Sequence, residues 1–289
     1  MSALARPRRS ALYLPASNAR AIEKARELAC DVVILDLEDA VAPEQKEEAR
    51  AQAVAAVKAG GFGPREVVIR ANGLDTPWGA EDLAAAAQAG SDAVLVPKVS
   101  SAEDLAACAG AAGSLRIWAM IETCQAMLRL DALAGASRAH RTDVWVIGTN
   151  DLAKEMRCPL TPERTPLLPA LSFAVMAARA HGLSILDGVY NEIADAEGVA
   201  AQCAQALAFG FDGKTLIHPS QIEAANRAFT PEPGAVAWAR TIVSAFEAPQ
   251  NAQRGVLKVE GRMVERLHLA EARRLIAVAD AIAAHEGGG

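Results

Sequence analysis

The chain has few cysteines, and their spacing excludes several kinds of site. Its five cysteines are scattered along 289 residues, and no two of them form a C-x-x-C pair. A disulfide framework or a structural zinc site would need closer grouping, so we expect reduced thiols and neither kind of site. Cys124 follows an acidic residue at the end of a predicted strand, but no histidine lies near it in sequence to activate a cysteine nucleophile.

Basic clusters and long apolar runs are also missing. The net charge is −6, and the only basic block is the short stretch at residues 6–9, so nucleic acid is not an expected partner. No apolar run approaches the ~20 residues that a membrane-spanning helix requires. No hydrophobic signal region precedes the first predicted strand at Ser10, so we expect a cytoplasmic protein.

The sequence does contain eight short, β-branched runs, and helical patterns separate them. From the second run onward, nearly every run ends in a polar residue capable of chemistry. The runs are residues 10–16, 32–38, 66–72, 93–99, 115–123, 142–150, 183–190 and 213–221. Strands that alternate with helices of ~10–15 residues favour βαβ units and a parallel sheet. We therefore predict an α/β fold, a (β/α)8 TIM barrel over residues 1–230, in which all the polar strand ends meet on one face.

The predicted helices mostly end at glycine, which is the usual left-handed stop. They cover residues 18–30, 44–59, 78–89, 102–112, 125–134, 166–181 and 195–209, followed by one that ends near Phe229; Ser17 and Ser100 or Ser101 are expected N-caps. Residues 154–165 are predicted to be a long loop, either a lid or a plain surface connection. Residues 231–289 form a predicted helical extension or lid, with helices at 235–247 and 269–285 and turns near Gly255 and Gly261. We expect this tail to be too short for a core of its own.

Five carboxylates are predicted to converge at the barrel mouth: Asp36, Glu38, Asp39, Glu122 and Asp151. Such a group would repel strongly unless a cation lay among them. Mg2+ typically uses one or two protein carboxylates and leaves its other positions to water or substrate. Glu122 and Asp151 are one βα unit apart and arrive side by side, so we predict them as the ligands. The alternative is that these acids only cap the helices that follow.

Arg70 is a lone cation at the end of the third run. It can hold a substrate carboxylate or a developing enolate oxygen, or it can form a salt bridge to a neighbouring acid, and the two roles can coexist. Gly148, Thr149 and Asn150 provide a flexible turn whose backbone N–H groups can cradle a substrate carboxylate.

Lys46 and Arg50 lie one turn apart near the start of the second helix. They can reach phosphate groups, although a solvated helix face is an equally reasonable interpretation. His218 precedes Pro219 and Ser220, where it can simply shape the turn, so we leave it out of the catalytic set.

Seven strings, taken in order, resemble the citrate lyase β-subunit-like proteins, which are CoA-ester lyases of the HpcH/HpaI aldolase and citrate lyase superfamily. The strings are RSALYLPASN, DVVILDLEDAVAPEQKEEAR, VVIRANGLDTPWGAEDL, AVLVPKVSSAEDL, WAMIET, VIGTNDLA and KTLIHPSQIEAANRAFTP. Any one string is unspecific, but the ordered set is highly specific. The resemblance runs from about residue 10 to residue 231 and continues more weakly through the tail.

The resemblance implies a trimeric or hexameric barrel enzyme that requires Mg2+. In the family pattern the metal acids match Glu122 and Asp151, and the substrate arginine matches Arg70. The remaining correspondences complete the site: Glu38 and Asp39 would support the metal's water shell, Lys46 and Arg50 would contact CoA phosphates, and Lys98 would lie nearby in a supporting role.

The sequence departs from the family pattern at two positions. Lyases of the malyl-CoA and citramalyl-CoA type carry an aspartate in a G-x-M-x-D stretch that reaches a neighbouring subunit's site, and this chain has Glu265 at that position. Glutamate keeps the carboxylate but adds one methylene. Cys124 stands where many relatives have proline; this difference should alter the turn after Thr123 and leave Glu122 unchanged as a metal ligand.

These observations predict carbon–carbon cleavage of a 3-hydroxyacyl-CoA into a short acyl-CoA and a 2-oxo acid. Citramalyl-CoA is the first choice of substrate and malyl-CoA the next. Arg70 would stabilise the thioester enolate, and Glu265 from a neighbour would protonate it. The alternatives are a citrate lyase β subunit acting on citryl-acyl-carrier protein, a CoA-independent aldolase of 2-oxo acids, and a non-catalytic binder of CoA esters.

Overall fold

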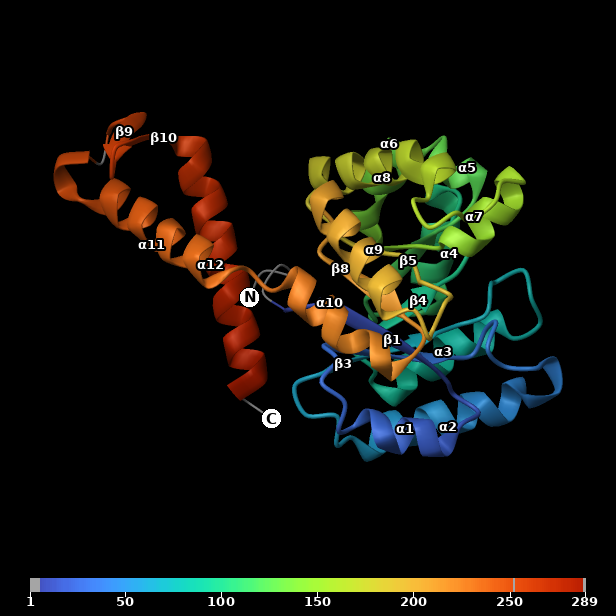
Figure 1. Ribbon diagram of the computed structural model, residues 1–289. Helices are drawn as coiled ribbons and strands as arrows, with labels where there is room; N and C mark the ends of the chain where they lie inside the picture. The colour runs from blue at the N-terminus through green and yellow to red at the C-terminus, as the bar shows by residue number, and fades with distance from the viewer. Residues whose placement is uncertain (1–5, 252, 288–289) are drawn as a thin grey trace. The chain divides into compact units, whose positions relative to one another are not determined.

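The computed structural model describes residues 6–251 and 253–287. The chain forms two compact units, one comprising Arg8–Phe229 and another that begins at Thr230. In the first unit, eight parallel strands close into a barrel in chain order (Figure 1). The strands are β1 (Ser10–Pro15), β2 (Val32–Asp36), β3 (Glu66–Arg70), β4 (Ala93–Val96), β5 (Ile117–Ile121), β6 (Thr142–Ile147), β7 (Ser184–Asp187) and β8 (Gly213–Leu216). The predicted TIM barrel is confirmed.

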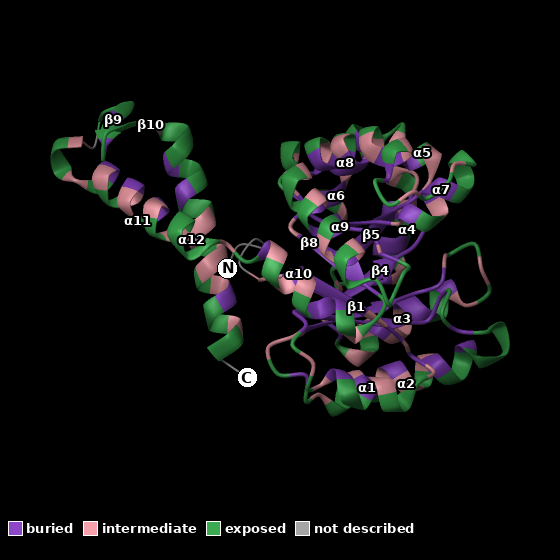
Figure 2. Ribbon diagram, viewed as in Figure 1, coloured by how far each residue is buried: buried purple, intermediate pink, exposed green. Residues whose placement is uncertain are grey.

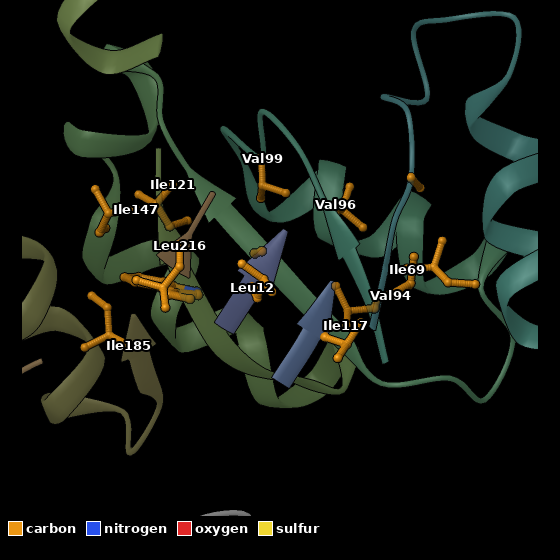
Figure 3. Packing of buried hydrophobic residues seen from close by; sticks show 14 of the residues in the cluster. Leu12, Ile69, Val94, Val96, Val99, Ile117, Ile121, Ile147, Ile185 and Leu216 are labelled. Atoms are coloured by element: carbon orange, nitrogen blue, oxygen red, sulfur yellow. The ribbon is translucent and has the colours of Figure 1, made fainter. Parts of the chain in front are cut away.

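The strands are buried on both faces (Figure 2), as expected for a parallel sheet covered by helices. Alternate side chains of each strand point into the barrel, where Val68, Leu95 and Trp118 belong to an inner cluster. The intervening side chains, such as Leu12 and Ile69, pack outward against the helices in a larger cluster (Figure 3). This alternation determines which strand residues can reach the barrel interior.

The helices of the first unit largely follow the predicted pattern. They are α1 (Ala19–Ala25), α2 (Lys46–Ala59), α3 (Gly79–Ala89), α4 (Ala102–Ala111), α5 (Cys124–Met127), α6 (Leu130–Ser137), α7 (Thr149–Met156), α8 (Leu168–Ala180), α9 (Ala196–Phe209) and α10 (Ile222–Phe229). Short 3-10 turns are η2 (Pro43–Gln45), η3 (Arg138–His140), η4 (Thr165–Leu167) and η5 (Pro219–Gln221). Ser101 caps α4 as predicted, by accepting a hydrogen bond from the Asp104 N–H.

Three local predictions are wrong. Asn18, not Ser17, caps α1, because its side chain accepts from the Ala21 N–H. The single predicted helix at 125–134 is two helices, α5 and α6, separated near Leu128. The predicted loop at 154–165 begins later, since α7 continues to Met156 and the left-handed Arg157 then ends it.

The second unit contains α11 (Pro233–Glu247), η6 (Pro249–Asn251), β9 (Val256–Val259), β10 (Arg262–Glu265) and α12 (Arg266–Gly287). The predicted turn-rich stretch is in fact an antiparallel hairpin of β9 and β10, with its tight turn at Glu260 and Gly261. The expectation that the tail lacks a core is also wrong: Ile242, Phe246 and Val264 belong to a hydrophobic cluster formed entirely within this unit. No helix in the described parts of the chain is long and apolar enough to cross a membrane.

Candidate active site at the carboxyl ends of the barrel strands

The charged strand ends lie on one face of the barrel because all eight strands are parallel. Asp36 ends β2 and Arg70 ends β3, and the register pairs these two residues directly. Glu122 follows β5, and Asp151 lies in the first turn of α7 after β6. The predicted site residues of the first unit therefore come from neighbouring elements around the same rim.

Arg70 is the centre of an ion-pair network at this rim. Its Nε and Nη2 donate to the two carboxylate oxygens of Asp36, each at 2.6 Å. Its Nη1 lies 2.8 Å from Oε2 of Glu38 and 3.7 Å from Oδ2 of Asp39. Asp36, Glu38 and Asp39 therefore do converge, and the cation among them is the Arg70 guanidinium, whose single charge offsets part of theirs. Burial lowers the pKa of Arg70, whereas the neighbouring carboxylates, Asp36 above all, raise it. The carboxylates outweigh burial, so the pKa of Arg70 lies above its ordinary value.

Sequence reasoning missed two residues beside Arg70. The ring of Tyr13, on β1, stacks on the guanidinium with 4.7 Å between the ring centroid and Cζ. The Tyr13 hydroxyl lies 4.0 Å from Sδ of Met120, and Nη1 of Arg70 lies 3.8 Å from the same sulfur. In the sequence both residues look like ordinary core residues of their strands. The only available signal was the alternation of side chains along a strand, which places both of them on the inward face.

Glu122 is a buried carboxylate with one unused oxygen. Its Oε1 accepts a 2.7 Å hydrogen bond from the backbone N–H of Lys98, whereas its Oε2 has no partner. A side chain at Gly148 would collide with Oε2, so the glycine makes room for it. Burial raises the pKa of Glu122 to about 8. A buried, unpartnered carboxylate oxygen is costly unless another group binds it.

Asp151 is close enough to Glu122 to raise the pKa of that carboxyl further. Among the described residues, no group of three or more His, Cys, Asp or Glu side chains is arranged to hold a metal ion. A pair of carboxylates remains, which matches the one or two protein ligands typical of Mg2+. The assignment of Glu122 and Asp151 as ligands stays a prediction.

Lys98 has an unusual backbone in the β4–α4 connection. Its φ is +55°, in the left-handed region that costs a non-glycine residue energy. This conformation directs its N–H to Glu122, while the half-exposed ammonium lies 3.8 Å from Oε1 of Glu38. The pKa of Glu38 rises to about 7, chiefly because the carboxyl is buried, so Glu38 can exchange a proton near neutral pH.

The start of α7 supplies free backbone donors. No side chain caps this helix, which begins after Gly148 with Thr149, Asn150 and Asp151. The first N–H groups of an α-helix have no intrahelical acceptor and attract anions. Asn150 exchanges two side-chain hydrogen bonds, of 3.2 and 3.0 Å, with Asn191 in the β7–α9 loop. This loop therefore supports α7 where the predicted carboxylate cradle lies.

Lys46 and Arg50 do not lie as free cations on a helix surface. Lys46 is buried, and its ammonium donates to the carbonyls of Leu37 and Glu38 and to Oδ1 of Asn72, each at 2.8 Å. Arg50 donates to Glu81 at 2.5 Å and to Asp82 at 2.6 Å. A phosphate at Lys46 would have to displace its acceptors, whereas Nη2 of Arg50 is buried and has no hydrogen-bond partner. The contact of these two residues with CoA phosphates stays a prediction.

The two remaining residues lie apart from this network. His218 caps η5 by accepting a hydrogen bond from the Ser220 N–H, in agreement with its interpretation as a residue that shapes the turn. Glu265 ends β10 in the second unit, where its backbone N–H donates to His268. Its predicted role at a neighbouring subunit's site stays a prediction.

Comparison with known proteins identifies the family. The model of the HpcH/HpaI aldolase/citrate lyase family matches residues 9–219. The chain belongs to this family. It is 48% identical to a (3S)-malyl-CoA thioesterase from Cereibacter sphaeroides, over 98% of this chain and 99% of that one. It is 32% identical to the citrate lyase subunit beta of Escherichia coli, over 95% and 94% of the two chains.

Solved structures give the same result for the fold. CitE from Mycobacterium tuberculosis, in complex with magnesium, acetoacetate and coenzyme A, is 30% identical in sequence and superposes with a TM-score of 0.76. The match covers 96% of the present chain and 99% of the CitE chain. RipC from Yersinia pestis gives a TM-score of 0.69 at 29% identity and covers 80% and 99% of the two chains. The resemblance stated from sequence is thus confirmed at the level of family and fold.

Proposed function

We propose that this protein is a Mg2+-dependent enzyme of malyl-type CoA thioesters, with thioester hydrolysis as its main reaction. The observation that carries the proposal is the buried, unpartnered Oε2 of Glu122 beside Asp151, next to the arginine network of Arg70. The 48% identity to a protein named (3S)-malyl-CoA thioesterase favours malyl-CoA over the citramalyl-CoA expected from sequence.

The residues present fit a bound Mg2+. Oε2 of Glu122 lacks a partner, and hard carboxylate oxygens are the ligands that this ion prefers. Glu122 and Asp151 would hold the ion, which when bound supplies Lewis-acid polarisation of substrate oxygens. The magnesium in the CitE complex is consistent with this arrangement.

Arg70 and Glu38 supply the charge and the proton transfer. Asp36 holds the Arg70 guanidinium by two hydrogen bonds, so the cation is preorganised before substrate arrives. Glu38, with a pKa of about 7, can take a proton from a water molecule that attacks the thioester carbon. Negative charge then develops on the carbonyl oxygen near Arg70, the carbon–sulfur bond breaks, and CoA leaves as its thiol after protonation. The N–H groups of residues 149–151 would bind the distal carboxylate of the malyl group.

Carbon–carbon cleavage is the second candidate, and the likeness to citrate lyase beta subunits favours it. The same groups would serve: the base would take the proton of the substrate hydroxyl instead of a proton of water, and both reactions need a cation near the thioester oxygen. Glu265 is the observation that favours hydrolysis, because it departs from the aspartate of lyases of the malyl-CoA type.

The deciding experiment incubates the protein with (3S)-malyl-CoA and (S)-citramalyl-CoA, with Mg2+ or with EDTA. Hydrolysis releases a free thiol and malate, whereas cleavage releases glyoxylate or pyruvate and leaves acetyl-CoA. We expect Mg2+-dependent thiol release from malyl-CoA. Release of the 2-oxo acid without thiol would make the protein a lyase, and binding without turnover of either ester would favour a non-catalytic CoA-ester binder. In a separate incubation without CoA esters, turnover of a free 2-oxo acid substrate by a protein that turns over neither ester would indicate a CoA-independent aldolase.

A further inference from the structure

Two hydrogen-bond donors in the site point at a poor acceptor. Tyr13 and Arg70 both contact Sδ of Met120, at 4.0 and 3.8 Å respectively. A thioether sulfur is only a weak acceptor, so the Tyr13 hydroxyl is poorly satisfied there, whereas Nη1 of Arg70 also lies 2.8 Å from Oε2 of Glu38. Met120 has a flexible side chain that can change rotamer at low cost. An oxygen atom that entered here when the Met120 side chain moved aside, and that lay about 1 Å closer to both donors, would accept a hydrogen bond from each.

The position of Tyr13 is constrained from two sides. Its ring stacks on the Arg70 guanidinium, and Asp36 holds the edge of that guanidinium, so the ring and the cation form a layered pair. Tyr13 is only partly buried, whereas Ala11, two residues earlier on the same face of β1, is completely buried. The tyrosine is thus among the uppermost inward side chains of its strand, on the face where the candidate site lies.

The hydroxyl of Tyr13 acts as a donor at neutral pH. Burial raises its pKa, and so do the carboxylates of Asp36, Glu122 and Glu38, which together outweigh the opposing effect of Arg70. In the described part of the chain, the hydroxyl donates to no carboxylate or carbonyl oxygen.

We propose that the Tyr13 hydroxyl, together with Nη1 of Arg70, donates a hydrogen bond to the thioester carbonyl oxygen of the substrate and stabilises its developing negative charge. This inference rests on the proposed function and adds a catalytic residue to it. Both hydrolysis and carbon–carbon cleavage place negative charge on that oxygen, so the role of Tyr13 is the same in either reaction. No proton leaves the tyrosine: the hydroxyl donates a hydrogen bond throughout.

The test compares Tyr13→Phe with Tyr13→Leu. The phenylalanine variant removes only the hydroxyl and keeps a ring over Arg70, whereas the leucine variant removes both. For Tyr13→Phe we expect kcat to fall about 10- to 100-fold, because removing one oxyanion donor has effects of this order or larger. KM and the stabilisation of the fold by Mg2+ should change little. A Tyr13→Phe variant with a kcat within about twofold of the parent would overturn the proposal, even if Tyr13→Leu were inactive.

Tyr190 offers a matched control because it is the only other tyrosine in the chain. Its hydroxyl donates to Asp195 in the β7–α9 loop, so Tyr190→Phe makes the same chemical change away from Arg70. We expect a kcat near that of the parent. The Tyr190→Phe protein also leaves Tyr13 as the sole tyrosine, and 13C-labelled tyrosine then gives a single NMR signal for the phenol carbon.

This signal separates failure of the inference from failure of the proposed function. The probe is a malyl-CoA analogue in which a methylene replaces the thioester sulfur, so that the carbonyl oxygen remains. A shift of the Tyr13 signal when this analogue binds supports the inference even if malyl-CoA is not the natural substrate. Binding of the analogue without a shift overturns it. If the analogue does not bind at all, the proposed function fails and the inference fails with it.

Discussion

The surroundings of Glu122 raise its pKa and so make the stability of the metal-free protein depend on pH. It is 1% exposed, one of its oxygens is held by the Lys98 backbone, and the other is free beside Gly148. In the metal-free protein its folded pKa of about 8 lies above the ordinary value of 4.5. Between these pH values the folded state keeps a proton that the unfolded state has released. Stability therefore falls as the pH rises from 4.5 to 8.

Glu122→Gln should remove this pH dependence. We expect the metal-free variant to be more stable than the parent at pH values near 8 by on the order of a few kcal/mol, since each pKa unit corresponds to about 1.4 kcal/mol. The variant should also lose the rise in melting temperature that Mg2+ gives the parent. Thermal unfolding at several pH values, with Mg2+ or EDTA, measures both effects. A glutamine variant that Mg2+ still stabilises as strongly would show that Glu122 is not a ligand.

At the scale of elements, the cations at the start of α2 are paired, whereas those of helix α1 are exposed. Arg20 and Lys24 lie one turn apart on α1, both are exposed, and neither side chain has a hydrogen-bond or ion-pair partner among the described residues. The first turn of α1 follows β1 directly, so it lies on the same barrel face as Arg70. These two residues are therefore further candidates, beside Lys46 and Arg50, for contacts to CoA phosphates.

The double variant Arg20→Ala/Lys24→Ala should raise KM for the CoA ester about tenfold and leave kcat unchanged, because a charge-assisted hydrogen bond contributes about 1.5–3 kcal/mol. Steady-state kinetics with malyl-CoA and with malyl-pantetheine, which lacks the nucleotide phosphates, tests this. KM for the pantetheine ester should stay the same. Arg227→Ala is the control, since this exposed arginine is in the last turn of α10, at the opposite face. An unchanged KM for malyl-CoA in the double variant, or an equal rise of KM for both esters, would exclude the phosphate contact.

A buried ion network joins three elements near α7. Asp187, at the end of β7, accepts from Arg164 at 2.6 Å and from Lys214 of β8 at 2.7 Å. Lys214 also donates to the Gly188 carbonyl and to Gln202, so all of its three N–H groups have acceptors. Through these bonds the loop before α8 and the loop after β7 are fixed beside α7.

Lys214→Met should destabilise the protein by about 3–5 kcal/mol, the usual cost of leaving a buried charge without its partner. Lysine and methionine have similar lengths, so lost packing contributes little. Urea unfolding followed by circular dichroism gives the difference. Lys154→Met, at an exposed position of α7, is the matched control and should change stability by less than about 0.5 kcal/mol. A small effect of Lys214→Met would mean that Arg164 alone satisfies Asp187.

At the scale of the whole molecule, the second unit carries the one candidate acid outside the barrel. Glu265 lies on a hairpin whose own strands and helices form a hydrophobic cluster. A carboxylate on a unit with its own core can be presented to a site as a rigid body. The predicted trimer or hexamer would let it reach the site of a neighbouring subunit.

Glu265→Gln should lower kcat at least tenfold if this carboxylate takes part in proton transfer. Co-expression of Glu265→Gln with Glu122→Gln tests where it acts, because a mixed oligomer would contain some sites with both carboxylates intact. We expect activity to return in the mixture although each variant alone is inactive. A mixture that stays inactive would place Glu265 at the site of its own chain, and full activity of Glu265→Gln would remove it from the mechanism.

The sequence by itself determined the barrel, the rim of charged strand ends and the family. Runs of β-branched residues that end in Asp36, Arg70 and Glu122 are local patterns, and parallel strands bring such ends together whatever the details of packing. The hairpin and core of the second unit were missed because its strands have only four residues each and lie beside helical patterns.

The tertiary structure decided which charges are free to act. The sequence could not tell that Lys46 is buried among three oxygen acceptors, or that Asp36, Glu38 and Asp39 share Arg70. It could not tell that Tyr13 stacks on this arginine or that Oε2 of Glu122 has no partner. Such facts depend on contacts between residues far apart in the chain, and burial and pairing, more than residue type, determine the energy of a charge.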